Sequence, residues 1–260
     1  RAAWWLHVWE PLPGMQGLFS EWIAPPYPGP PWLEYVASSL LVTFQAVFLN
    51  QLLNQFRLND SPNYFYAALF VLLSSFCPPF LFLSAPLLAN TFLIFALSQL
   101  LLVYQRKVAI IPMYNTGIWL GVAALFCWGY VVFLLWAFVA WRILTSYSLR
   151  EWILLLLGFA TPWLLIGTWL FWNDQLPLLW ENGIVTPTRW LAFDWTPYFY
   201  WPTLLGLVLY GLLGLVVFLS AGSFYFKQKM QAQKVLSALY WMIPIGGFPV
   251  LFQKDLSLLQ

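Results

Sequence analysis

Three carboxylates are the residues of this sequence best suited to acid–base chemistry: Glu10, Glu21 and Asp174. A carboxylate held close to a membrane surface can take the proton from a sugar hydroxyl, so glycosyl transfer is the chemistry that they suit. We predict that Glu10 is the general base, because it closes an apolar segment, and that Glu21 or Asp174 orients the acceptor. The competing interpretation is that Glu10 and Asp174 are solvated residues at helix ends.

Aromatic side chains accompany these carboxylates in two stretches, 10–33 and 174–201. Aromatic rings stack on the C–H faces of sugars, and carboxylates accept hydrogen bonds from sugar hydroxyls. The residues predicted to bind substrate are Trp22, Trp32, Trp180, Glu181 and Arg189. Indole rings also settle at the headgroup level of a membrane whatever the function of the protein, and that interpretation stays open.

Other kinds of site have little support in the sequence. His7 is the single histidine, and Cys77 and Cys127 lie inside apolar runs, so we expect no metal site. There is no glycine-rich nucleotide-binding loop and no basic run, which argues against nucleotide and nucleic-acid ligands. We expect no cofactor, although a polyprenyl-phosphate lipid would fit as a substrate.

The elements that position these residues are apolar helices. Of the 260 residues, 62% are hydrophobic and 8% are charged, and the mean hydropathy is +0.76. A soluble domain carries ~25% charged residues, so this chain cannot cover a surface that faces water. The composition predicts an all-α, polytopic transmembrane protein that forms a single domain over residues 1–260.

About nine helical segments are expected. They are 1–9, 33–56, 63–83, 84–104, 112–127, 128–141, 151–173, 202–226 and 235–252. Pro78, Pro79 and Pro86 turn the third and fourth segments into a hairpin, and the run 112–141 is expected to split near Gly129. Segment 1–9 is too short to cross a bilayer at 1.5 Å per residue, so we expect the chain to be truncated at both ends.

Charge separates the two sides of this arrangement. One side carries most of the basic residues: Arg57, Arg106, Lys107, Arg142, Arg150, Lys227, Lys229 and Lys234. The other side carries most of the acidic residues: Glu10, Glu21, Glu34, Asp174, Glu181 and Asp194. The positive-inside rule predicts that the basic side is cytoplasmic and that the long loops, 10–33 and 174–201, are external.

Several motifs predict local structure. Within the first loop, apolar residues at helical spacing predict a short amphipathic helix over 14–24, packed beside the second loop. Gly117 and Gly121 form a GxxxG pattern that favours close helix packing. Asn50, Asn54 and Arg57 share one helical face, and packing between helices is favoured over a phosphate or partner site. Glu151 lies at a predicted helix start, where a negative charge is stabilising.

Two resemblances follow from longer stretches. The segments "FLNQLLNQFRL", "LLSSFCPPFLFLSAPLLANTFLIFALSQLLLVYQRK", "NTGIWLGVAALFCW" and "SLREWILLLLGFATPW" resemble an uncharacterised family of Bacteroidota inner-membrane proteins, over roughly residues 40–235. The order of loops and middle helices is also similar to the GT-C module of membrane glycosyltransferases. The first GT-C loop usually supplies a catalytic aspartate, whereas the loop 10–33 offers Glu10 and Glu21.

These resemblances imply a location and two candidate functions. The location is a bacterial inner membrane, with the long loops in the periplasm. The first function is cell-envelope glycan assembly on a polyprenyl-linked sugar at the outer face, with or without glycosyltransferase activity. The second is that of a non-catalytic accessory or scaffold subunit in a larger inner-membrane complex of secretion or motility. The expected partners are therefore membrane lipid and, for the second function, other subunits.

Overall fold

The computed structural model of the 260-residue chain is all-helical, and the part of the chain that it describes contains no strand. The described residues are 17–19, 31–56, 64–75, 80, 83–105, 109–145, 149–180, 208, 211, 215 and 230–251. The helices are α2 (Pro31–Gln55), α3 (Phe65–Ser75), α4 (Ala85–Leu102), η2 (Val103–Gln105), α5 (Ile110–Phe126), η3 (Trp128–Val132), α6 (Phe133–Leu144), α7 (Leu149–Trp172), α8 (Leu176–Trp180) and α11 (Met230–Leu251).

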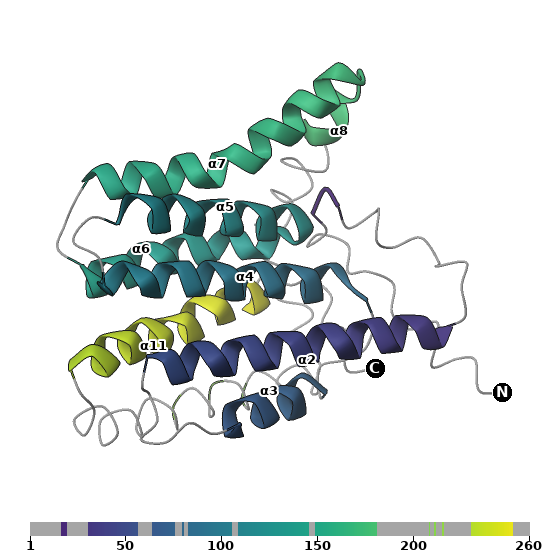
Figure 1. Ribbon diagram of the computed structural model, residues 1–260. Helices are drawn as coiled ribbons and strands as arrows, with labels where there is room; N and C mark the ends of the chain where they lie inside the picture. Colours follow the sequence, from purple (N-terminus) through teal and green to yellow (C-terminus); the bar gives the residue numbers. More distant parts are fainter. Residues whose placement is uncertain are drawn as a thin grey trace.

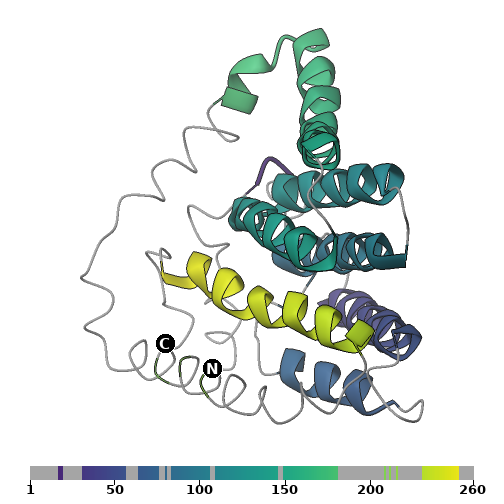
Figure 2. The same cartoon turned by 90° about the vertical axis from the view of Figure 1, so that its left-hand side faces the viewer.

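The long helices lie roughly side by side and alternate in direction along the chain (Figure 1). We call the end where α2 begins and α7 ends the loop end, and the opposite end the hairpin end. From α7 the stack passes through α5, then α4 and α6, then α11 and α2, to α3 on the far side (Figures 1 and 2). The most extensive packing joins α5 to α7 and α4 to α5.

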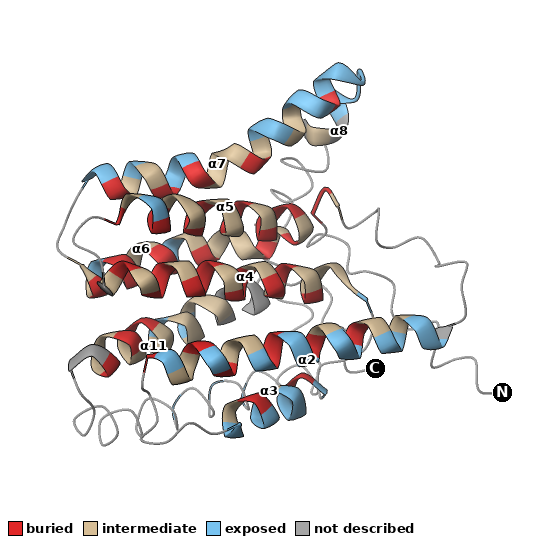
Figure 3. Cartoon of the chain, in the orientation of Figure 1, coloured by how far each residue is buried: buried red, intermediate tan, exposed pale blue. Residues whose placement is uncertain are grey.

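The helices α2, α4 and α7 are long and apolar enough to cross a membrane, whereas α3, α5 and the η3–α6 unit are shorter apolar helices. Large apolar side chains remain exposed on the outer helices α2, α3 and α7 (Figure 3). Hydrocarbon can cover such a surface and water cannot, which agrees with the composition. The prediction of a membrane protein is therefore supported, while the prediction of nine segments extends into 1–9 and 202–226, largely outside the described residues.

Most predicted segment boundaries lie within a few residues of the observed helix ends, although α3 ends at Ser75 whereas the predicted segment continues to 83. The run 112–141 is divided at Cys127, whose extended backbone (φ −147°, ψ 114°) ends α5 before η3 begins. Ser84 caps α4 by accepting a hydrogen bond from the Leu87 amide at 3.4 Å, and Pro86 stands in the first turn. Pro at that position needs no amide donor, so it starts the helix rather than breaking it.

The interface between α5 and α7 is a close backbone contact made by glycines. A Cβ atom added at Gly117, Gly121 or Gly158 would lie within 3.0 Å of a carbonyl oxygen on the facing helix. Beside these glycines, the hydroxyl groups of Tyr114 and Thr161 lie 3.1 Å apart. The GxxxG pattern at Gly117 and Gly121 thus has the packing role that the sequence predicts.

Charged residues of the described helices also separate as predicted. Glu34 lies in the first turn of α2 and Asp174 follows α7, so both are at the loop end. Arg142 is in the last turn of α6, and Arg150 and Lys234 stand near the starts of α7 and α11, at the hairpin end. The charge asymmetry is thus a property of the helical stack.

Glu151 is buried at the hairpin end, which the sequence did not predict. Its Oε2 accepts a hydrogen bond from the Trp141 indole at 2.7 Å, and its Oε1 accepts one from the Ala109 amide at 3.4 Å. Ala109 is the N-cap of α5 and has no side-chain cap of its own. The carboxylate therefore stabilises the positive N-terminal ends of both α5 and α7. Its hydrogen bond with Trp141 also connects α6 to these two helices.

Candidate functional site at the loop end

Parts of the two long loops meet at the loop end. Leu18, from the first loop, is buried against Leu125 of α5 and Leu170 of α7, and Leu179 of α8 packs on the same cluster. Leu18 and Leu179 thus pack on the same cluster, as expected if the first loop lies beside the 174–201 segment. The cluster fixes one point of each loop on the ends of the same helix pair.

The described part of the first loop is a turn docked on the end of α5. The Gly17 amide donates to the Phe126 carbonyl and the Phe19 amide donates to the Leu125 carbonyl, each at 3.2 Å. Only glycine fits at position 17, because an added Cβ would overlap the Leu125 carbonyl. No helix includes residues 17–19. The rest of the amphipathic helix predicted over 14–24 lies outside the described residues.

Asp174 stands beside this cluster, in the turn between α7 and α8. Its φ of 55° is left-handed, its amide donates to the Phe171 carbonyl at 3.2 Å, and the Gln175 amide donates to Leu170 at 2.9 Å. This is the Schellman arrangement that ends many helices, and aspartate is among the residues that tolerate its left-handed position. The turn holds an exposed carboxylate in a fixed place, and it also gives Asp174 a purely structural role.

Trp32 is the other predicted site residue with a described side chain. It lies in the first turn of α2 and is 60% exposed. The end of α7 and the start of α2 lie on opposite sides of the stack in both views (Figures 1 and 2). The described part of the chain therefore does not bring Trp32 and Asp174 together, and Trp32 fits the interfacial aromatic belt equally well.

The remaining predicted site residues cannot be placed. Trp180 ends α8, and its side chain is not described. Outside the described residues lie Glu10, Glu21, Trp22, Glu181 and Arg189. Among the described residues, no group of histidine, cysteine, aspartate and glutamate could hold a metal ion. Of the three carboxylates predicted to be catalytic, the described residues therefore include only Asp174, which lies beside an apolar cluster.

A polar connection between α2 and α4 was not predicted. Gln45 is buried, and its Nε2 donates to the Leu87 carbonyl at 2.9 Å and to Thr91 Oγ1 at 2.7 Å. Its Oε1 accepts from Asn90 Nδ2 at 3.1 Å. The available signal was the presence of an amide inside each of two apolar segments, Gln45 and Asn90. This network holds α2 on the stack and leaves no polar atom of Gln45 for a ligand.

Asn50 lies about one and a half turns further along α2 and is buried too. Its Oδ1 has no hydrogen-bond partner among the described residues. The predicted face of Asn50, Asn54 and Arg57 is therefore buried at Asn50, in agreement with a packing role. Arg57 lies outside the described residues.

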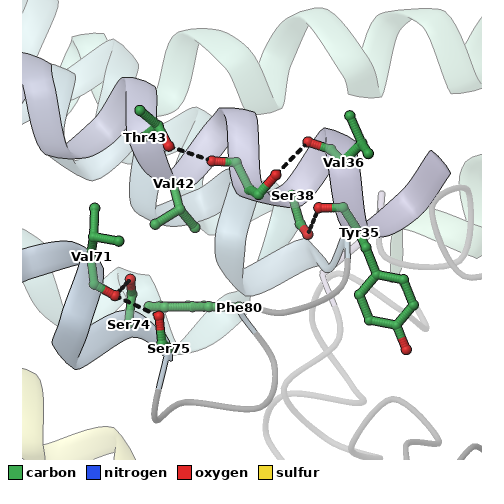
Figure 4. Close-up of a pocket in the computed structure, with 10 residues that line it drawn as sticks. Tyr35, Val36, Ser38, Val42, Thr43, Val71, Ser74, Ser75 and Phe80 are labelled. Carbon is green, nitrogen blue, oxygen red and sulfur yellow. Dashed lines mark hydrogen bonds between the residues drawn. The ribbon is translucent and has the colours of Figure 1, made fainter. Parts of the chain in front are cut away.

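A groove between α2 and α3 was also missed. Its volume is about 440 Å³, and side chains from both helices line it together with Phe80 (Figure 4). The lining residues are Tyr35, Val36, Ser38, Ser39, Val42, Thr43, Val71, Ser74, Ser75 and Phe80. The available signal was the pair of adjacent serines in each of two successive apolar segments, "ASSLLVT" and "LLSSF".

Comparison with protein-family models, curated proteins and solved structures gives no match. The resemblances to the Bacteroidota family and to the GT-C module therefore remain predictions from the sequence.

Proposed function

We propose that this chain is an integral membrane protein of cell-envelope glycan assembly that handles a polyprenyl-linked sugar at the loop end. The observation that carries the proposal is the cluster of Leu18, Leu125, Leu170 and Leu179, where parts of both long loops rest on one helix pair. Loops that are fixed to each other can enclose a substrate headgroup between them, whereas independent connectors cannot.

In the proposed reaction, Glu10 takes the proton from the acceptor hydroxyl. The acceptor oxygen then bonds to the anomeric carbon of the sugar, and the polyprenyl phosphate leaves with the electrons of the broken C–O bond. Asp174 or Glu21 would accept a hydrogen bond from the acceptor and orient it. For Asp174 this role is supported by the turn that fixes its backbone and leaves its side chain exposed.

The test is binding and transfer of a labelled sugar. The full chain in phospholipid nanodiscs would be incubated with a tritiated polyprenyl-phosphate hexose, and retained and transferred label would be counted. We expect wild-type protein to retain the label, and Glu10→Gln to bind it without transfer. Glu34→Gln is the matched control, because Glu34 is another loop-end carboxylate without a proposed role. Failure of the wild-type protein to retain the label would overturn the proposal.

The second candidate is a non-catalytic accessory subunit of a larger membrane complex. It is favoured by the end of α7, whose apolar side chains are exposed on several faces. They are Leu164, Leu165, Trp169, Phe171 and Trp172, the last 85% exposed. Purification from native membranes distinguishes the candidates: a stoichiometric protein partner that is released by Trp169→Ser supports the subunit, and a chain that purifies alone contradicts it.

A further inference from the structure

We infer that the groove between α2 and α3 binds one acyl chain of a bilayer phospholipid. The inference is independent of the proposed function, since the groove lies away from the cluster of Leu18 and Leu179. It rests on four properties of the groove: its position along α2, the hydrogen bonds that its serine and threonine hydroxyl groups already make, its volume, and the uncharged side chains of its described lining.

The groove lies along α2, a helix that is long and apolar enough to cross a membrane. Its lining on α2 runs from Tyr35 to Thr43, in the half of the helix nearer the loop end. This stretch is ~12 Å long at 1.5 Å per residue. In a bilayer the surroundings of the groove are lipid tails of one leaflet, so water does not fill it. Tyr35, at the end nearer the loops, marks the side where a headgroup would lie.

The serine and threonine hydroxyl groups of the lining already donate within their own helices. Ser38 and Ser39 donate to the Tyr35 and Val36 carbonyls at 3.0 and 2.9 Å. Thr43, one turn further on, donates to Ser39 at 2.8 Å. Figure 4 shows that these bonds stay on one side of the groove. A groove whose donors are satisfied does not require a polar occupant.

The serine hydroxyl groups on the α3 side of the groove also donate within their own helix. Ser74 and Ser75 of α3 both donate to the Val71 carbonyl, at 2.9 and 2.7 Å. No hydrogen bond joins the described hydroxyl groups of the two walls across the groove (Figure 4). What the walls present to an occupant is therefore mainly methyl and methylene surface from Val42, Val71 and the serine Cβ atoms.

The size of the groove selects a chain over a helix. A helix ~10 Å across fills roughly 420 Å³ per turn of ~5.4 Å. A groove of about 440 Å³ therefore encloses no more than one such turn, so a partner helix or a second copy of α2 could insert only side chains into it. A single hydrocarbon chain has a cross-section several times smaller than that of a helix and can lie inside the groove from Tyr35 to Thr43.

The absence of charge from the lining selects the common lipid. None of the described residues that line the groove is acidic or basic, so nothing in this lining favours a particular headgroup or a rare lipid. A site without headgroup selectivity fills by mass action with the lipid that surrounds it. The occupant is therefore an acyl chain of bulk phospholipid, rather than the polyprenyl chain of the proposed substrate.

Photo-crosslinking of lipid tests this inference. The full chain would be placed in phosphatidylethanolamine nanodiscs containing an analogue with a diazirine in the acyl chain, irradiated, digested and mapped by mass spectrometry. We expect adducts to concentrate on residues 35–43 and 71–75. They should exceed, per residue, the adducts on 164–172 of α7, where exposed apolar side chains meet lipid without a groove.

The decisive variant fills the groove. In Thr43→Trp we expect crosslinking at 35–43 and 71–75 to fall by about tenfold, as when two methylene groups lose their burial. Thr168→Trp is the matched control, because Thr168 is an exposed threonine of α7 that also donates to the carbonyl four residues earlier, at 2.8 Å. If Thr43→Trp fails to fold, Ser39→Leu serves the same purpose.

Four outcomes would overturn the inference. One is equal labelling of the groove and of 164–172. Another is labelling of the groove that neither Thr43→Trp nor Ser39→Leu reduces. The third is the absence of lipid adducts from residues 35–43, which would mean that protein covers them. Displacement of the label by polyprenyl phosphate at equimolar concentration, and not by phosphatidylethanolamine, would show that the chain is isoprenoid and would also overturn it.

Discussion

The helix pairs α5–α7 and α2–α3 both place small residues between the helices, but the first pair is closely packed and the second leaves a groove. Between α5 and α7, Gly117, Gly121 and Gly158 let the backbones touch, so no side chain separates the helices. Between α2 and α3, serines leave a groove of about 440 Å³. Small residues therefore do not by themselves produce close packing, since glycine removes the Cβ atom that even serine keeps.

The difference also concerns where hydrogen bonds go. The tight pair is joined by a contact between helices, Tyr114 to Thr161, whereas the hydroxyl groups of the loose pair bond within their own helices. A hydroxyl group whose hydrogen bonds all stay within its own helix adds no hydrogen bond to a neighbouring helix. The tight pair therefore forms the rigid side of the molecule, and the loose pair forms the side that admits another molecule.

Adding one methyl group to the tight interface should have the largest effect. In Gly158→Ala the new Cβ overlaps the Tyr114 carbonyl and forces α5 and α7 apart, so we expect a loss of about 2–3 kcal/mol in the free energy of unfolding. Gly167→Ala is the matched control on the same helix, because its nearest contact would be Leu179 Cδ1 at 3.9 Å.

The control should be neutral or stabilising by up to about 1 kcal/mol, as expected when alanine replaces glycine within a helix. Unfolding in detergent, followed by circular dichroism, measures both changes. Equal stability of Gly158→Ala and Gly167→Ala would show that α5 and α7 are not in backbone contact.

Removing the hydrogen bonds that hold α2 on α4 should have an intermediate effect on the free energy of unfolding. Gln45→Leu removes the hydrogen bonds to Leu87, Thr91 and Asn90, and we expect a loss of about 1–2 kcal/mol. Gln99→Leu is the control, since its bond to Asn115 is long, at 3.5 Å. The same unfolding assay applies, and a larger loss in Gln99→Leu than in Gln45→Leu would contradict the assignment.

Enlarging a side chain in the groove should have a small effect. Ser75→Leu adds bulk where space exists and removes a hydroxyl group that serves only its own helix, so we expect a change within about 0.5 kcal/mol. The comparison with Gly158→Ala is direct, because the larger substitution should cost less. A loss in Ser75→Leu as large as that in Gly158→Ala would mean that α2 and α3 are closely packed.

The smallest effect is expected for Cys127, at the end of α5 on the tight side. Its side chain is buried, with 3% exposed. We expect no labelling by N-ethylmaleimide at pH 8, because the reagent cannot reach the sulfur. The assay uses a Cys77→Ser background, with Asn173→Cys, exposed after α7, as the labelled control. Labelling of Cys127 at the rate of the control would show that the end of α5 is accessible to the reagent.

The sequence predicted the tight side better than the loose one. Apolar runs located the helices, and Gly117 and Gly121 predicted a close contact, because glycine at this spacing has few other uses within an apolar helix. The α2–α3 groove could not be predicted, since the spacing of Ser38, Ser39, Ser74 and Ser75 is equally compatible with packing. The network around Gln45 depends on a register between α2 and α4 that sequence periodicity does not determine.

The candidate site was predicted only in part. The pattern of loops suggested that the two long loops lie together, and Leu18 and Leu179 do. The sequence could not show that Asp174 adopts a left-handed backbone and ends α7, because helix termination depends on where the chain turns. It also could not show that Trp32 lies on the opposite side of the stack from Asp174.

Electron cryo-microscopy of the full chain in phosphatidylethanolamine nanodiscs tests most directly the claim that the two helix pairs differ in what lies between them. The predicted result is elongated density of single-chain width between residues 35–43 of α2 and 71–75 of α3, with none between α5 and α7. Side chains of α2 and α3 in mutual contact along that stretch, with no space for a chain, would contradict the claim.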